Sequence, residues 1–379
     1  MSEKNINKIF IIGNGYDLGH ELKTSYSDFI TWYLCEVVNR SLKSGTNIYE
    51  DDCLQISITS YYSPSARHEE CLKIFKEKIK NNLVDDLIVE NLISPSYQSF
   101  FIGIIPKTRF MKNLLSKCFE VDWNGIEYEI FHQIKISHHK IVSNYNGPNV
   151  FESEDFIAEN QEIRKLNNNI ICLRDNLIEY LITKNEPKVD KSNWFNIPLD
   201  VQAEHINDEL KGKVLFLNFN YTTHLFDTQY LLNTRYGKNF QTLEVLNIHG
   251  SIDNREDVVL GIGDEENEFY KEVETNYGDN WLNCMKSFHY LRNRRYQKLL
   301  QFISYEDYEV YVMGHSCSIT DRTLLKMLFE KRECKRIYVF HYNGQESYFK
   351  TAYNIARNFT DKVKLREVLM PYDESLKMR

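Results

Sequence analysis

The sequence predicts an α/β fold, in which a doubly wound, mainly parallel β-sheet is interrupted by a large helical insertion. Three observations lead to this prediction. Seven short apolar segments are typical of buried strands, helical patterns alternate with several of them, and one strand opens the chain whereas the other six follow residue 210. Alternating strands and helices favour a sheet that helices cover.

The strand segments are mostly continuous runs of apolar, β-branched or aromatic residues rather than alternating patterns. Strands that are buried on both faces of a parallel sheet have this composition. Helical patterns between them include Thr323–Lys331 and Glu346–Phe359. The predicted strands are Lys8–Ile12, Val214–Leu217, Leu243–Ile248, Val258–Ile262, Glu309–Met313, Arg336–Phe340 and Val363–Leu369.

The middle of the chain has a different character, with many charges and little strand signal between residues 48 and 209. Breaks rich in proline or asparagine are plausible joints in this region. We therefore expect a domain built from residues 1–47 and 210–379, with residues 48–209 as a mostly helical insertion. The segments with helical spacing are Cys71–Leu92, Phe110–Phe119 and Glu152–Thr183, and the breaks are Ser94–Ser96, Asn144–Pro148 and Glu186–Pro198.

Composition excludes several classes of protein. The chain has 379 residues, of which 42% are hydrophobic, and a net charge of -8. It is long enough for one large domain or two ordinary ones with a real core. The acidic balance argues against a generic nucleic-acid coat or a membrane-surface protein. No apolar stretch reaches about 18 residues, so we expect no membrane span.

The eight cysteines are scattered, and none forms a C-x-x-C pair. Without a signal peptide at the N-terminus, this pattern favours reduced thiols and a cytoplasmic location. A zinc site made mainly of cysteines is not expected, because its ligands usually come as close pairs. The cysteines are Cys35, Cys53, Cys71, Cys118, Cys172, Cys284, Cys317 and Cys334.

A glycine loop follows the first strand, in the stretch "IIGNGYDLG". A strand followed by G-x-G is where a doubly wound sheet holds a phosphate. The third glycine of a dinucleotide fingerprint would fall at position 18, but Leu18 stands there and Gly19 comes one residue late. The loop is therefore either a phosphate-binding loop or a tight turn. Asp17 is either a site residue or a helix cap.

Two further strands end in polar residues. "NFNYT" starts at Asn218, and the Asn220 amide could orient a sugar hydroxyl or a water, whereas Asn218 or Thr222 could instead cap a helix. "HG" places His249 directly after the third strand. A histidine can act as a general base near neutral pH, although a lone histidine at a strand end is often structural.

Polar residues also follow the later strands. Gly263 and Asp264 could be a site or a plain turn. "GHSCSITD" begins at Gly314, which permits close approach of the backbone, and Ser316 could bind a hydroxyl or a phosphate. Cys317 lacks a dedicated base and is not expected to be a nucleophile. Because the carboxyl ends of parallel strands share one edge of the sheet, these motifs together predict one polar cleft.

In this order, "GNGYDLGHELKTSYSDF", "NFNYT", "HG" and "GHS...TD" resemble the AbiH family of bacterial abortive-infection proteins. The series also resembles, more distantly, the sirtuin-like Rossmann domains that cleave NAD. Departures from the sirtuin pattern include Asn14 for alanine, Thr222 for aspartate, Ile30 for arginine and the absence of paired zinc cysteines. These departures speak against protein deacetylation.

The resemblance implies a Rossmann-like, sirtuin-like domain that binds NAD or NADP, as substrate or ligand, without zinc. Asn220 would orient water or the ribose on the nicotinamide side, and His249 would engage the ribose hydroxyls as base; these are the expected catalytic residues. The expected nucleotide-binding residues are Gly13, Asn14, Gly15, Asp17, Asn218, Tyr221, Gly250, Gly314, His315 and Ser316. No metal ligand is expected.

Three functions remain open on the sequence. The first is an anti-phage effector that hydrolyses NAD(P) at the nicotinamide–ribose bond. The second is a nucleic-acid-acting effector, since "KSFHYLRNRRYQKLLQF" (residues 286–302) is basic and aromatic, although a solvated helix face explains it as well. The third is a non-catalytic nucleotide sensor whose insertion contacts a phage-derived trigger or a second subunit.

Overall fold

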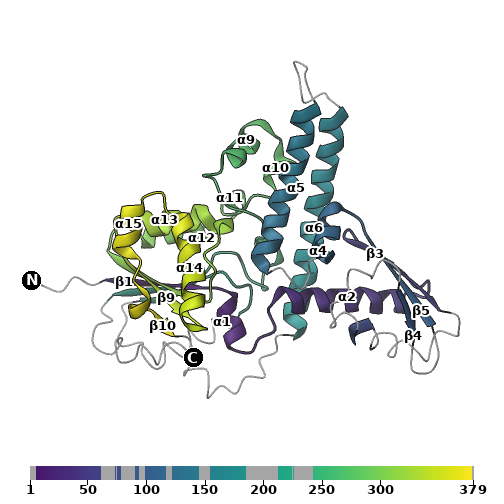
Figure 1. The fold of residues 1–379 in the computed structure, drawn as a ribbon, viewed down its shortest axis with the longest axis horizontal. Helices are drawn as coiled ribbons and strands as arrows, with labels where there is room; N and C mark the ends of the chain where they lie inside the picture. The colour runs from purple at the N-terminus through teal and green to yellow at the C-terminus, as the bar shows by residue number, and fades with distance from the viewer. Residues whose placement is uncertain are drawn as a thin grey trace, which may run out of the picture. The chain divides into compact units, whose positions relative to one another are not determined.

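The computed structural model describes residues 6–60, 73, 75–77, 90–93, 99–116, 122–144, 154–184, 212–223, 225 and 242–377. The chain divides into two compact units (Figure 1). The first, here called the sheet unit, comprises Met1–Thr24, Leu181–Thr275 and Met285–Arg379. The second, the helical unit, comprises Ser25–Tyr180 and Asn276–Cys284. The domain boundaries expected at 47 and 210 remain a prediction.

The sheet unit contains a parallel sheet with the strand order β10-β9-β8-β1-β6-β7. From central β1 the chain builds one side through β6 and β7, and then crosses over to build the other side from β8 outward. The predicted α/β fold with a mainly parallel sheet is confirmed, and it is compatible with a Rossmann-like domain. The strands are β1 (Asn7–Ile12), β6 (Lys213–Asn218), β7 (Thr242–Asn247), β8 (Tyr308–Met313), β9 (Cys334–His341) and β10 (Leu376–Lys377).

Both faces of this sheet are buried, which explains the continuous apolar strands. Ile9 and Ile11 of β1 contribute to one core cluster, which also includes residues from the helices that follow β7. Phe10 and Ile12 point to the opposite face. On that face, Phe10 stacks on Phe216 of β6 at 5.0 Å between ring centroids and on Tyr311 of β8 at 4.9 Å. These rings match the strand register and hold β1 between its neighbours.

Helices α12 (Arg295–Phe302), α13 (Arg322–Glu330), α14 (Gly344–Asn358) and α15 (Lys362–Val368) pack against the strands of this sheet (Figure 1). The sheet unit also contains α1 (Asn14–Gly19), α9 (Glu268–Asn276, whose last residue lies past the unit boundary) and α11 (Lys286–His289), with 3-10 turns at Arg255–Asp257, Ile319–Asp321 and Tyr372–Glu374. The predicted helices at Thr323–Lys331 and Glu346–Phe359 correspond to α13 and α14.

Two predicted strands are wrong. Val363–Leu369 is helix α15, because the Asp361 carboxylate caps it by accepting hydrogen bonds from the N–H groups of Val363 and Lys364. Val258–Ile262 is a buried extended segment outside the sheet, joined by a single bridge between Ile262 and Met285. Its apolar composition reflects burial rather than strand pairing.

Within the described residues, the predicted helical segments Phe110–Phe119 and Glu152–Thr183 correspond to α4 and α6. Most of the predicted helical segment Cys71–Leu92 lies outside the described residues, but its last three residues are wrong, because they belong to strand β4 (Glu90–Ile93). The three predicted breaks lie largely or wholly outside the described residues. The helices are α2 (Tyr26–Lys43), α4 (Arg109–Ser116), α5 (Trp123–Asn144), α6 (Glu154–Lys184, which runs past the unit boundary) and α10 (Asp279–Leu282). No helix in the described ranges is long and apolar enough to cross a bilayer.

The helical unit also holds an antiparallel sheet that was not predicted, with the order β2-β3-β5-β4. Its strand β3 alternates buried Leu54, Ile56 and Ile58 with more polar residues, which is the pattern of a strand with one buried face. Continuous apolar runs were the signal that identified the parallel strands, so this alternation was missed. The strands are β2 (Ile48–Glu50), β3 (Leu54–Ser60), β4 (Glu90–Ile93) and β5 (Ser99–Pro106).

Candidate functional site

The glycine loop after β1 packs directly against the loop after β8. A Cβ atom on Gly13 would lie 2.5 Å from the His315 Cα, and one on Gly15 would lie 2.8 Å from the Gly314 Cα. Gly314 has a φ of +69°, and a Cβ there would lie 2.2 Å from the backbone N of Tyr16. All three glycines are therefore required for two backbones to touch.

The N–H groups of Gly13, Gly15 and Tyr16 in this loop are already used within the protein. Gly15 N–H donates to the Gly314 carbonyl at 2.9 Å, and Tyr16 N–H donates to the Gly13 carbonyl at 2.9 Å. Asn14 is the first residue of the six-residue helix α1 and is half-buried. The contact between the two loops thus accounts for the glycines without a phosphate, which favours the tight-turn interpretation of the motif.

Asp17 connects α1 to the loop after β6. Its carboxylate is buried and accepts a hydrogen bond from the Thr222 hydroxyl at 2.8 Å. Burial raises the pKa of Asp17 to about 7, and hydrogen bonds from Thr222 and Asn220 oppose this shift. Asn220 also donates to the Gly13 carbonyl at 3.1 Å. Asp17 is not the N-cap of α1, because that position belongs to Gly13.

Three other predicted binding residues make contacts that hold the strand ends in place. The Asn218 side chain accepts from the Asn220 N–H at 3.1 Å and donates to Asn247 at 2.9 Å. The Tyr221 hydroxyl donates to the Val259 carbonyl at 2.9 Å. Gly250 has a φ of +87° at a turn where a Cβ would lie 2.1 Å from the Asp257 carbonyl oxygen.

The main polar cluster centres on Asp321, which ends the 3-10 turn before α13. Its Oδ1 lies 2.7 Å from the Lys286 Nζ and 3.1 Å from the His249 Nε2, and all three side chains are buried. Burial by itself would raise the pKa of Asp321, but the Lys286 ammonium and His249 hold it far below its usual range. Asp321 is therefore a carboxylate that fixes Lys286 and His249.

His249 is held as a neutral ring with a defined orientation. Burial lowers its pKa, and so does the Lys286 ammonium, whereas Asp321 acts in the opposite direction. Its Nε2 faces Asp321 and lies 3.4 Å from the Tyr290 hydroxyl. Its Nδ1 has no hydrogen-bond partner within the described part of the chain. A carboxylate that fixes one ring nitrogen and leaves the other as an acceptor is the arrangement of a histidine base.

His315 completes the cluster. Its Nδ1 accepts the Cys317 N–H at 3.0 Å, so Nε2 carries the proton and faces the Asp321 Oδ2 at 3.6 Å. Burial lowers the pKa of His315 to about 4. The Phe219 ring contacts both histidines, at 4.9 Å from His249 and 4.1 Å from His315. The sheet edge thus brings His249 and His315 together around one carboxylate.

The remaining residues near this edge have structural contacts. The Ser316 carbonyl accepts from Asn354 at 2.9 Å. Cys317 is buried, and burial raises the pKa of its thiol, so it is not an activated nucleophile. Asp264 is buried beside Arg322 at 3.5 Å. These contacts stabilise the loops at the carboxyl edge of the sheet. The polar cleft predicted at this edge remains a prediction.

A family model described as "Bacteriophage abortive infection AbiH" matches residues 9–342 of this chain, which covers most of both units. The chain belongs to the AbiH family. The resemblance noted from the four motifs is confirmed by this match. A search of curated proteins finds no match to the chain.

Two residues of the main cluster in this AbiH protein were missed from the sequence. Asp321 lies in the motif "GHS...TD" but was not among the expected site residues, and Lys286 was counted in a basic stretch. Lys286 follows the apolar residue Met285 and begins a short helix, and this local sequence does not indicate that the lysine is buried. Its partner is 35 residues away along the chain.

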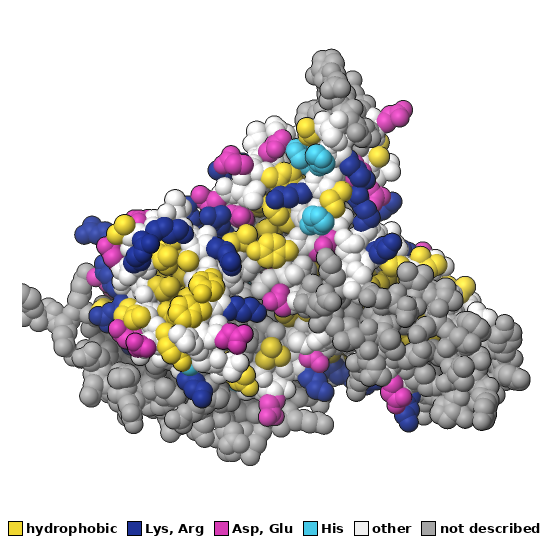
Figure 2. Space-filling model, viewed as in Figure 1, with side chains coloured by type: hydrophobic (Ala, Val, Ile, Leu, Met, Phe, Trp, Pro, Cys, Tyr) yellow, Lys and Arg dark blue, Asp and Glu magenta, His cyan; other side chains and the backbone are white. Residues whose placement is uncertain are grey.

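The basic stretch in this AbiH protein is not one continuous basic helix. It forms α11 and α12, Lys286 is fully buried, and Arg295 forms an ion pair with Asp257 at 2.7 Å. On the face shown in Figure 2, lysine and arginine side chains alternate with acidic and hydrophobic ones. These contacts favour the interpretation of the stretch as part of the fold, with exposed Arg294 and Lys298 as solvated positions.

Proposed function

We propose that this AbiH protein acts in anti-phage abortive infection by binding NAD or NADP at the carboxyl edge of its parallel sheet and hydrolysing the nicotinamide–ribose bond. The observation that carries the proposal is the buried cluster of His249, Asp321 and Lys286 at this edge. Loss of NAD would arrest the infected cell, which agrees with the abortive-infection description of the family.

The strand order supports a ligand at this position. A chain that builds one side of a parallel sheet and then crosses over to build the other creates a switch point, and ligands bind beyond the carboxyl ends of the strands there. In this sheet the reversal occurs beside β1, between β1 and β8. Because of this switch point, we include a doubly wound, sirtuin-like arrangement of the sheet in the proposal.

His249 is the proposed base. With Nε2 held by Asp321, its Nδ1 would engage the ribose hydroxyls and the attacking water. In the reaction, the bond between ribose C1′ and the nicotinamide nitrogen breaks, and its electron pair leaves with nicotinamide. The water oxygen bonds to C1′, and the water proton passes to His249 and then to solvent. The ring must be neutral to accept this proton, and its lowered pKa supports that state.

Asn220 is the proposed orienting residue. Its amide is held between the Gly13 carbonyl and Asp17, so its position relative to the strand end is defined. Asp17, with a pKa of about 7, is a second group that can exchange a proton near neutral pH. The nucleotide would lie beyond Asn14 and Ser316, because the N–H groups of Gly15 and Tyr16 are engaged within the loop contact.

Incubating the purified protein with NAD and following nicotinamide release tests the proposal. The assay is run with the protein alone and after addition of extracts from infected and from uninfected cells. We expect turnover by the wild type, and a loss of at least about 100-fold in His249→Ala, since general bases contribute on this scale. Asn220→Ala should also lose activity. His139→Ala, at an exposed position on α5, is the matched control and should retain both activity and phage protection.

Three results would contradict the proposal. Absence of nicotinamide release under every condition would remove the catalytic function, and tight NAD binding by calorimetry without turnover would assign a sensor role instead. Phage protection that is unaltered in folded His249→Ala and Asn220→Ala would show that this edge of the sheet is not the effector site. Thermal unfolding of each variant checks that the fold is intact.

A further inference from the structure

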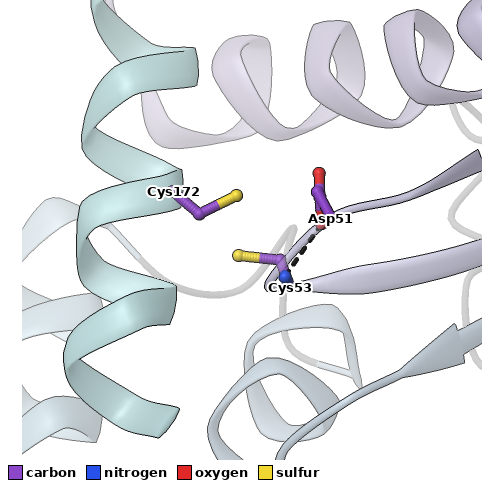
Figure 3. Close-up of side chains that lie close together, drawn as sticks. All are labelled: Asp51, Cys53 and Cys172. Carbon is purple, nitrogen blue, oxygen red and sulfur yellow. Dashed lines mark hydrogen bonds between the residues drawn. The ribbon is translucent and has the colours of Figure 1, made fainter. Parts of the chain in front are cut away.

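A second group of chemically reactive side chains lies in the helical unit. Asp51 and Cys53 belong to the turn between β2 and β3, and Cys172 lies on α6. Each offers one ligand atom, and these atoms all lie within 4.8 Å of one another. Figure 3 shows the two sulfur atoms pointing toward one another, with Asp51 beside them. Nothing in the proposed NAD chemistry uses these three residues.

We propose that Asp51, Cys53 and Cys172 bind a zinc ion that joins the β2–β3 turn to α6. Zn²⁺ is bound in proteins by thiolate and carboxylate ligands, usually with four ligands in a tetrahedron. Zinc–sulfur bonds of about 2.3 Å place two tetrahedral sulfur ligands about 3.8 Å apart. The three atoms therefore need to move by about 1 Å or less, which rotation of the side chains can supply. A water would be the fourth ligand.

The surroundings of Asp51 are those of a preorganised ligand. Its Oδ1 accepts the N–H groups of Cys53 and Leu54, both at 2.8 Å, and its Oδ2 accepts the Tyr33 hydroxyl at 2.9 Å. Carboxylates that bind metals are commonly held by such hydrogen bonds, which orient them. A carboxylate has about four lone-pair sites, two on each oxygen, so Oδ2, which accepts one hydrogen bond, retains a site for an ion.

The two sulfurs are also positioned from outside the cluster. Asn176 donates a hydrogen bond to the Cys172 sulfur at 3.6 Å, which stabilises a thiolate. Cys53 is fully buried, and its thiol donates to the Asn169 carbonyl at 3.6 Å. The Asn169 side chain in turn donates to the Asp52 carbonyl, so α6 and the turn are already joined around the cluster.

The thiolate, not the thiol, is the form of cysteine that binds a metal ion. Zinc binding would release the thiol protons of Cys53 and Cys172 to solvent, and affinity should therefore fall as the pH falls. A zinc site was not expected from the sequence because the cysteines do not come as close pairs, whereas here the close pair is Asp51 and Cys53, in a D-x-C pattern.

Metal analysis and cobalt titration of the full-length protein test this inference. Protein purified without chelator should carry about one zinc per chain, and Co²⁺ added to the metal-free protein should give thiolate–cobalt charge-transfer absorption. Cys172→Ser should abolish this absorption. Asp51→Asn, which can still accept the backbone hydrogen bonds, should weaken Co²⁺ binding by about tenfold or more. Cys35→Ser, at a half-buried position on α2, is the matched control and should bind as the wild type does.

Added Zn²⁺ should also raise the thermal unfolding temperature of the wild type and of Cys35→Ser, but not of Cys172→Ser. This readout does not depend on any enzymatic activity. Equal Co²⁺ spectra in the wild type and in folded Cys172→Ser would overturn the inference. So would a Cys53–Cys172 disulfide in the protein as isolated, seen as an intact mass lower by two hydrogens, because an oxidised pair cannot supply thiolates.

Discussion

The ammonium of Lys286 lies 2.7 Å from Oδ1 of Asp321, and neither side chain is more than 4% exposed. The same oxygen faces His249, so one carboxylate neutralises the buried cation and orients the histidine. A lysine with this degree of burial would be costly without its partner. The stability of the sheet edge and the state of the proposed base therefore depend on the same ion pair.

Breaking this pair should strongly destabilise the protein. Asp321→Asn leaves Lys286 as an uncompensated buried charge, and we expect the free energy of unfolding to fall by about 3–5 kcal/mol. Lys286→Met combined with Asp321→Asn should cost less than the sum of the two single changes. Urea unfolding measures all three variants. As a matched control, Glu162→Gln in the exposed Lys165–Glu162 pair should cost less than about 1 kcal/mol. Strict additivity of the two changes would contradict the coupling.

Asp17 should make stability depend on pH. Its folded pKa of about 7 lies above the ordinary value of 3.8, so between these values the folded state holds a proton that the unfolded state has lost. Stability from this group is full below about pH 4 and is lost as the pH rises toward 7. Histidines with lowered pKa values oppose this trend, so the comparison must be with a variant.

Asp17→Asn isolates the effect of this carboxyl. The free energy of unfolding of the wild type, relative to Asp17→Asn, should decrease between pH 4 and pH 7 and then level off. Denaturant unfolding in a series of buffers measures the difference. A constant difference over this range would show that Asp17 does not take up a proton on folding.

The contact between the two glycine loops should tolerate no side chain. Gly314→Ala forces a residue with a Cβ into a left-handed conformation and against the Tyr16 backbone, and should cost at least about 1–2 kcal/mol. Gly19→Ala is the control, because nothing lies within 4 Å of a Cβ at that position. Thermal unfolding of both variants checks this. Equal unfolding temperatures for the two variants would contradict the close contact between the two loops.

The cap of α15 should contribute a smaller amount. Asp361→Ala removes the acceptor of the Val363 and Lys364 N–H groups and should lower the free energy of unfolding by about 1 kcal/mol. Asp361→Asn retains a capping oxygen and should cost clearly less. Chemical denaturation distinguishes these outcomes, and an equal loss in both variants would assign the effect to charge rather than to capping.

Much of the sheet could be predicted from the sequence because its strands are buried on both faces. Ile9–Ile12 and Val310–Met313 are apolar throughout, which is a local signal that requires no knowledge of the neighbours. Val363–Leu369 was mistaken for such a strand, although an aspartate two residues before Val363 was the signal of a helix start. The strand β3 was missed because only alternate residues are buried.

The candidate site was predictable only in part. Polar residues at strand ends indicated Asn220, His249 and His315, and the family motifs included Asp321. The sequence did not indicate that Gly13, Gly15 and Gly314 serve one backbone contact, because that requires two loops 300 residues apart to meet. It also did not indicate that Lys286 is buried, since a lysine belongs in a core only when a carboxylate lies beside it.

The sequence by itself determined the parallel sheet, the AbiH family and the strand ends that carry polar groups, because periodicity and motif order are properties of the chain. Tertiary structure decided which polar side chains lie beside one another. Three such pairs come from segments that are distant along the chain, namely Lys286 with Asp321, Asp17 with Thr222, and Cys53 with Cys172. Their electrostatics depend on distance and burial, and only the folded chain sets these.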